Sequence, residues 1–144
     1  MNRELKFRAF CKNDIEIKQP LLFEQKIIDD ELFFVCSEDK EIRYDFQIPF
    51  IDPDCWILQQ YTGLKDKNGK EIFEGDILKI TKKAETFKKW NLEILFRDGG
   101  FGYMLSYYGK PFEIEYLTNM RIEQIGFEIK GNIYQNPKLL TCTK

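Results

Sequence analysis

The chain has 144 residues, 43% of them hydrophobic and 32% charged, which excludes a disordered protein and is enough for one domain with its own core. Its formal net charge of −2 provides no long-range attraction to nucleic acids or acidic membranes, so such binding would require a local basic patch. Because the chain has no histidine, general acid–base catalysis would depend on side chains that need large pKa shifts near neutral pH.

Nothing in the sequence predicts export or membrane insertion. Residues 1–6 lack the apolar core of a secretion signal, and the longest apolar run, residues 32–36, is too short to span a bilayer. We therefore expect a cytoplasmic protein without a membrane partner. The cysteines form no Cys-x-x-Cys pair, which favours reduced thiols over two disulfides, zinc binding or redox chemistry. They are Cys11, Cys36, Cys55 and Cys142.

The first expected strand opens the chain. Apolar and charged residues alternate from Leu5 to Ala9, a two-residue period that is typical of a half-buried strand. Residues 15–55 then carry short apolar clusters separated by acidic residues and prolines. We expect this stretch to form a small inserted sub-structure, with the barrel core in residues 56–144.

The strongest turn pattern lies at Asn68-Gly69. Both residues tolerate positive φ, which a two-residue type I′ hairpin requires. Residues 56–61 have regular strand character before this turn, and Gly75-Asp76 redirects the chain into a further strand over residues 77–80. The segment therefore predicts antiparallel strands with tight corners, but it indicates no chemistry.

A second hairpin is predicted around Asp98-Gly99-Gly100. Apolar and polar residues alternate over residues 91–97, before the turn, and one face of the strand after it is apolar or aromatic. The residues on that face are Phe101, Tyr103, Leu105 and Tyr107. Gly102 lies between two aromatic residues, which predicts a bulge or a close backbone approach.

The last part of the chain contributes one more strand and a short helical turn. Residues 112–118 fit either a strand or a helical turn, and residues 125–129 again show a two-residue period. Asn136-Pro137 fits an N-cap followed by proline at the first helical position, so one helical turn is expected over residues 138–140. We therefore predict a mainly β fold with little helix, arranged as a small bent barrel or roll.

Three sequence blocks resemble the YopX-like proteins of phages and prophages. The blocks are residues 5–10, 60–76 and 131–137, and they occur in the family's order and span nearly the whole chain. The chain departs from the family pattern at Phe10, where members often have Trp, and at residues 128–130.

This resemblance implies a single YopX-like domain over residues 1–144 with an SH3-like barrel element. It also implies a protein that is encoded by a phage or prophage and acts inside a bacterium. The family is largely uncharacterised, so the resemblance implies no activity and provides no catalytic or ligand-binding residues.

Acidic residues around the Asn-Gly turn suggest calcium binding, but the spacing is wrong. An EF-hand loop needs glycine at its sixth position, whereas Gly69 is fourth from Asp66. Glu113 and Glu115 would share one side of a strand as paired carboxylates, although a solvated face is the commoner reason for this pattern. The chain also has no Gly-x-Ser-x-Gly elbow, P-loop or dinucleotide fingerprint. We expect no enzyme activity, no metal and no cofactor.

A lysine-rich segment that ends in tryptophan supports an alternative function. Lysines that reach phosphates beside a ring that stacks on a base would form a single-stranded nucleic-acid surface. A charged, solvated hairpin tip explains the same pattern, and the negative net charge favours that explanation. The candidate contacts, within residues 79–90, are Lys82, Lys83, Lys88, Lys89 and Trp90.

The second half of the chain has more tyrosines than the core of a small barrel needs. Exposed aromatic patches are typical of protein interfaces. We therefore favour a non-enzymatic accessory protein that binds another protein or copies of itself as a homo-oligomer. The candidate interaction surface comprises Tyr103, Tyr107, Tyr108 and Tyr116.

Overall fold

The computed structural model describes most of the chain as antiparallel β structure in two compact units. The described residues are 5–11, 21–28, 31–36, 56–82, 90–105 and 113–141. The units are Met1–Tyr61 and Thr62–Lys144, so the division falls inside one strand, β4 (Trp56–Lys65). The prediction of a mainly β fold with little helix is confirmed.

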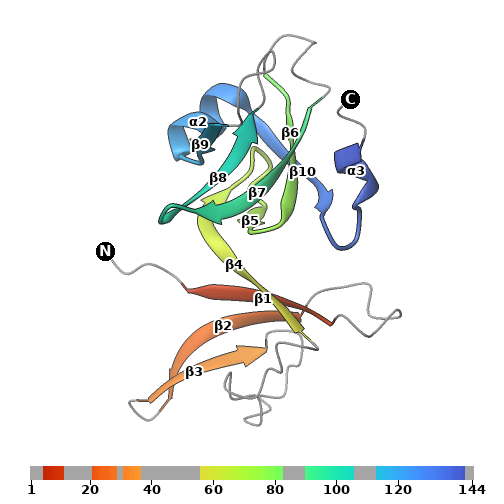
Figure 1. The fold of residues 1–144 in the computed structure, drawn as a ribbon. Coiled ribbons are helices and arrows are strands. Elements are labelled where there is room, and N and C mark those ends of the chain that lie inside the picture. The colour runs from red at the N-terminus through yellow and green to blue at the C-terminus, as the bar shows by residue number, and fades with distance from the viewer. Residues whose placement is uncertain are drawn as a thin grey trace. The chain divides into compact units, whose positions relative to one another are not determined.

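The first unit is an antiparallel sheet with the strand order β3-β2-β1-β4 (Figure 1). Its other strands are β1 (Lys6–Cys11), β2 (Leu21–Ile28) and β3 (Glu31–Cys36). The expected opening strand is therefore confirmed, and the stretch predicted as a sub-structure, residues 15–55, contributes two strands.

Cross-strand side-chain pairs support the β1–β4 register. Arg8 faces Gln59, and its Nε and Nη2 donate to Gln59 Oε1 at 2.9 and 2.7 Å. The ammonium group of Lys6 lies 5.8 Å from the centre of the Tyr61 ring. These contacts give both cations polar or aromatic partners, which reduces the cost of burying Lys6 and of partly burying Arg8.

The second unit contains a five-stranded antiparallel sheet with the order β10-β6-β7-β8-β9. Its strands are β6 (Asp76–Ile80), β7 (Asn91–Arg97), β8 (Gly100–Leu105), β9 (Glu113–Tyr116) and β10 (Phe127–Asn132). A short strand, β5 (Glu71–Phe73), pairs with β4. Within the described ranges no pairing joins the edge strands β10 and β9, so the sheet is open there. The predicted barrel closure and its SH3-like form are therefore not confirmed.

The hydrophobic core of the second unit lies on one face of this sheet. The ring of Tyr103 meets that of Phe127 edge-on, with centroids 5.2 Å apart. The fully or almost fully buried members are Ile72, Leu78, Ile80, Leu92, Ile94, Tyr103, Leu117, Ile122, Ile125 and Phe127.

A short helix, α2 (Asn119–Ile125), contributes to this core and was not expected from the sequence. Thr118 caps its start by accepting a hydrogen bond from Arg121 N at 3.2 Å, and Gly126 ends it with a φ of 69°. Ile122 and Ile125, three residues apart, face the core. The predicted terminal helical turn is confirmed as α3 (Lys138–Thr141).

Both predicted tight turns are present, but the type I′ geometry expected at Asn68-Gly69 is found at the other turn. Asp98 and Gly99 both have positive φ, at 51° and 82°, as a type I′ turn requires. At the other turn only Gly69 has positive φ, at 80°, and its N–H donates to Asp66 O at 3.0 Å. Asn68 does not share this conformation, so the turn is a type I turn followed by a glycine bulge rather than type I′.

Two ambiguous segments take definite structures. Residues 112–118 contain β9, which favours the strand over the helical turn. Gly102 makes the predicted close approach, because a Cβ built there would lie 2.6 Å from Glu115 O on that strand. Among the described residues, no helix combines the length and apolar character needed to cross a membrane.

Candidate functional site

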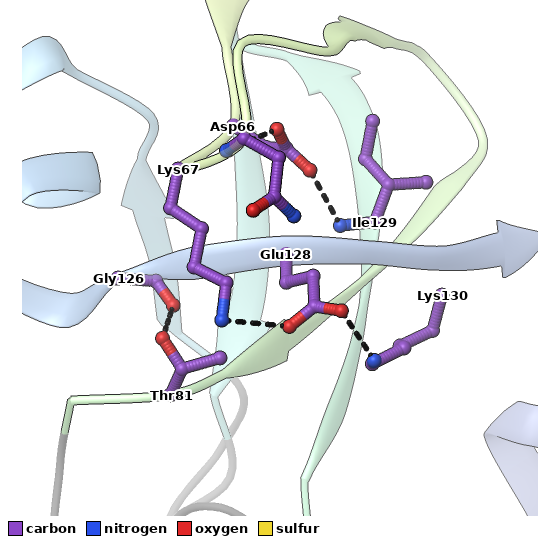
Figure 2. A network of polar contacts seen from close by, with 8 residues as sticks. Asp66, Lys67, Thr81, Gly126, Glu128, Ile129 and Lys130 are labelled. Atoms are coloured by element: carbon purple, nitrogen blue, oxygen red, sulfur yellow. Dashed lines mark hydrogen bonds and ion pairs between the residues drawn. The ribbon is translucent and has the colours of Figure 1, made fainter.

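The Asp66 carboxylate is at the centre of the Asn-Gly turn, where it binds three backbone amides. Figure 2 shows its contact with Ile129. Its Oδ1 accepts from Asn68 N at 2.8 Å and from Lys70 N at 3.0 Å, and its Oδ2 accepts from Ile129 N at 3.0 Å. Asp66 is 6% exposed. It therefore holds the turn in shape and fastens it to β10, which is a structural role that uses both carboxylate oxygens.

A second carboxylate in the same region, Glu128, lies between two lysines (Figure 2). Its Oε2 is 2.8 Å from Lys67 Nζ and its Oε1 is 2.5 Å from Lys130 Nζ. Hydrogen bonds from the Lys130 and Lys67 ammonium groups lower the pKa of Glu128 to about 2. Glu128 is therefore a carboxylate throughout the physiological pH range and cannot act as a general acid there.

The family-like block near the C-terminus joins the Gly75-Asp76 corner. Asp76 is 2% exposed, and its Oδ2 accepts from Phe73 N at 2.8 Å. Asn132, on β10, faces Asp76 and donates from Nδ2 to Asp76 Oδ1 at 3.4 Å. Asn132 Oδ1 in turn accepts from Tyr134 N at 3.0 Å. The polar residues of these two blocks therefore serve the fold.

These contacts decide between the two interpretations of the acidic turn. Asp66 directs its oxygens at backbone amides, so the calcium interpretation loses its first ligand. In the ranges that the structure describes, no group of three or more His, Cys, Asp and Glu side chains is arranged to hold a metal ion. Glu115, half of the predicted carboxylate pair, binds Arg121 instead, with Oε2 and Nη2 2.5 Å apart.

The predicted nucleic-acid residues divide into two groups. Lys82 Nζ donates to Glu123 O at 2.7 Å, and Lys82 N donates to Ile125 O at 2.9 Å, so this lysine satisfies carbonyls at the end of α2. Trp90 packs against the hydrophobic core. Both residues thus have structural contacts that compete with nucleic-acid binding. Lys83, Lys88 and Lys89 lie outside the described residues.

The structure describes two of the four tyrosines predicted to form an interaction surface, and these two differ in exposure. Tyr103 is 1% exposed and belongs to the core, so its ring is not offered to a partner. Tyr116 is 46% exposed and lies on β9. Tyr107 and Tyr108 lie outside the described residues.

Tyr116 belongs to the sheet face opposite the core. It pairs with Gly102, and Ile114 pairs with Met104, whereas the core residue Tyr103 pairs with Glu115. Since side chains alternate across a strand, Tyr116, Ile114 and the two glycines Gly100 and Gly102 share the outer face. The Tyr116 ring covers Gly100, where a Cβ would lie 2.9 Å from its Cδ1 and Cε1. We call this surface, formed by Gly100, Gly102, Met104, Ile114 and Tyr116, the β9 face.

One ionisable cluster was missed by sequence reasoning, because its members lie far apart in the chain. Burial first and the charge of Glu74 second raise the pKa of Glu93 above its ordinary value of 4.5. Burial, followed by the charges of Glu74 and Glu93, also raises the pKa of Tyr134. Residues so far apart in the chain form no periodic pattern, so the cluster could not be predicted from the sequence.

Replacing Glu93 with glutamine should stabilise the protein at pH 7 by less than about 1 kcal/mol, since Glu93 is only partly buried and solvent still screens its charge. A raised folded-state pKa means that the fold disfavours the carboxylate. The wild type therefore loses stability relative to Glu93→Gln as pH rises through that pKa, and the two converge below the ordinary value of 4.5.

Urea unfolding from pH 3.5 to 8 measures this difference in the free energy of unfolding. Glu123→Gln, at an exposed glutamate on α2, controls for the loss of one negative charge. If Glu93→Gln raised the free energy of unfolding at pH 3.5 as much as at pH 7, ionisation of Glu93 would not be the cause of the effect.

Comparisons with known proteins agree with the three sequence blocks. A family model described as YopX protein matches residues 6–141. The crystal structure of protein EF1440 from Enterococcus faecalis is similar, with a TM-score of 0.51 and 26% sequence identity over 94% of this chain and 97% of that chain. No curated protein matches the chain. On the match to its family model, which spans nearly the whole sequence, the chain belongs to the YopX protein family.

Proposed function

We propose that this YopX-family protein is a non-enzymatic accessory protein of a phage or prophage that binds another protein or copies of itself through the β9 face. The observation that carries the proposal is the position of Tyr116, a large aromatic residue that is 46% exposed on an edge strand. Tyrosines of this kind are enriched at protein interfaces, because they offer a large apolar area and a polar hydroxyl.

The backbone of β9 supports the same proposal. β9 is the last strand of its sheet, and among the described residues no further strand pairs with its outer edge. Such an edge can accept an extended segment of a partner as an additional strand. Glu115 is tied to Arg121, so a partner strand would meet the alternate side chains Ile114 and Tyr116 on the outer face.

Three carboxylates in and beside the family-like blocks give further support to a non-enzymatic role. Asp66 and Asp76 are buried and accept hydrogen bonds from backbone amides, and Glu128 is paired with two lysines. A general acid or base needs a proton that it can exchange near neutral pH. These carboxylates are instead used to fix turns and strands.

A photo-cross-linking amino acid at position 116 tests the proposal directly. Position 134 is the matched control, since Tyr134 is 44% exposed but lies in the turn after β10 rather than on the β9 face. We expect protein cross-links in host cells from position 116 and none above background from position 134. An aromatic probe at position 116 preserves most of the ring, so the fold is retained.

Light scattering during size-exclusion chromatography tests whether the partner is a second copy. Tyr116→Ser should weaken association about tenfold, since truncating an aromatic anchor costs more than about 1 kcal/mol, while Tyr134→Ser should leave it unchanged. Equal cross-linking from both positions, together with a monomer at every concentration, would overturn the proposed interface.

A further inference from the structure

A group of lysines surrounds a single glutamate at the edge of the second unit's sheet that lies farthest from β9 in strand order. Glu128 on β10 binds Lys67 and Lys130, and the β6–β10 register places Lys79 directly opposite it. Residues that face each other on paired strands have neighbouring side chains. We call Lys67, Lys79, Lys130 and Glu128 the β10 lysine patch. Three positive charges and one negative charge give it a net charge of +2, on a chain whose net charge is −2.

The patch is held in place by the Asp66 turn. Lys67 N donates to Phe127 O at 3.0 Å, and Asp66 Oδ2 accepts from Ile129 N, a contact shown in Figure 2. The turn is therefore fastened to β10 at two points. Glu128 then fixes two ammonium groups, one through each oxygen. The Lys67 and Lys130 side chains remain 35% and 37% exposed, so both are accessible from solvent. The negative charge of Asp66 is directed at three backbone amides beneath this surface.

We propose that the β10 lysine patch binds the phosphate backbone of nucleic acid without reading its sequence. The patch has an excess of two positive charges, and a lysine ammonium group is a compact point charge that binds phosphate oxygens. Closely spaced phosphates of a nucleic-acid backbone can contact several such charges at once. The patch contains no aromatic ring on which a base could stack, so contacts are limited to the backbone. This surface is separate from the β9 face. It shares Lys79 with the segment of residues 79–90 but includes none of the contacts predicted there, which run from Lys82 to Trp90.

Fluorescence anisotropy with a labelled 20-base-pair duplex and a labelled single strand tests the proposal. We expect binding at 50 mM salt with a dissociation constant of about 10⁻⁴ to 10⁻⁶ M, which weakens steeply by 200 mM salt, as for other backbone contacts. Lys67→Gln and Lys130→Gln should each weaken binding about three- to tenfold and reduce the salt slope by about one. Glu128→Gln removes the only negative charge of the patch and should tighten binding.

Arg97→Gln is the matched control, because Arg97 is an exposed cation at the end of β7, next to the Asp98-Gly99 turn. Its loss changes the net charge equally and should leave binding unchanged. Glutamine retains the aliphatic stem of lysine, and urea unfolding of each variant establishes that the fold is intact.

Three results would overturn the assignment. The first is no binding at 50 mM salt, and the second is an equal loss from Arg97→Gln and Lys130→Gln, which would mean a general charge effect. The third is that poly-glutamate, at the same concentration of charges, competes as strongly as unlabelled duplex does. This result would identify an acidic protein as the partner. None of these results bears on association through Tyr116, which light scattering measures separately.

Discussion

Replacing Asp66 with asparagine should lower the free energy of unfolding by about 2 to 3 kcal/mol, because it removes a charged acceptor and leaves at least one partly buried backbone N–H without a partner. One oxygen of Asp66 serves Asn68 N and Lys70 N, and the other serves Ile129 N. Asparagine has one carbonyl oxygen, so its amide group must place an N–H against a backbone N–H on one side. Urea unfolding monitored by tryptophan fluorescence gives the change.

Asp98→Asn is the control for this substitution. It makes the same chemical change at an exposed aspartate in the other hairpin turn, where φ is 51°. Asparagine tolerates this conformation as well as aspartate does, so we expect a change of less than about 0.5 kcal/mol. Equal effects at the two positions would contradict the role assigned to the Asp66 carboxylate.

Gly102→Ala should destabilise the protein by about 2 to 3 kcal/mol, in the range of overpacked sites. The added Cβ would lie 2.6 Å from Glu115 O and 2.9 Å from Ile114 Cγ2, and the first of these is a backbone atom that cannot rotate away. β9 would have to move away from β8. The variant should therefore also reduce cross-linking from position 116, since Tyr116 lies on the displaced strand.

Gly100→Ala provides the comparison, because it lies on the same strand and face. Its added Cβ would meet only two ring atoms of Tyr116, both at 2.9 Å, and an exposed ring can turn aside. We expect a loss of less than about 1 kcal/mol, at the low end of the overpacking range. A loss as large as that for Gly102→Ala would show that the backbone contact with Glu115 is not the limiting feature.

Local patterns predicted the corners of the fold better than their detailed geometry. Asp98-Gly99 forms the expected hairpin turn, and it is of type I′ because both residues adopt positive φ. At Asn68-Gly69 the turn type differs because Asp66 binds the amides of Asn68 and Lys70 and, beyond them, Ile129 N. The contact between Asp66 and Ile129 joins residues that are 63 positions apart, so patterns of neighbouring residues cannot predict it.

The helix α2 was missed although its boundaries are marked in the sequence. Thr118 precedes it, Gly126 follows it, and Ile122 and Ile125 are spaced as on one helical face. Seven residues are too few to form a stable helix by propensity, so this one depends on packing Ile122 and Ile125 into the core. Whether the sheet closes into a barrel could not be predicted from local sequence either, since closure depends on pairing between strands that are far apart in the chain.

The β9 face shows how far sequence periodicity can predict which residues form a surface. Alternation places Tyr103 and Gly102 on opposite faces of β8, but it does not state which face is covered. The structure covers the Tyr103 face and leaves Tyr116 exposed above the glycines. The glycines at positions 100 and 102 of the same strand indicate in the sequence which face lies outside the core, since a face without side chains cannot form a core by itself.

In the function proposed above, the polar residues of the family blocks hold the backbone in place, and binding takes place at the surface. Native-state amide hydrogen exchange tests this role of the polar residues most directly, with wild type compared to Asp66→Asn. We expect the amides of Asn68, Lys70 and Ile129 to exchange at least about tenfold faster in the variant, while the Phe73 amide, held by Asp76, accelerates only as far as the fall in the global free energy of unfolding requires. Unchanged exchange at all three amides would contradict it.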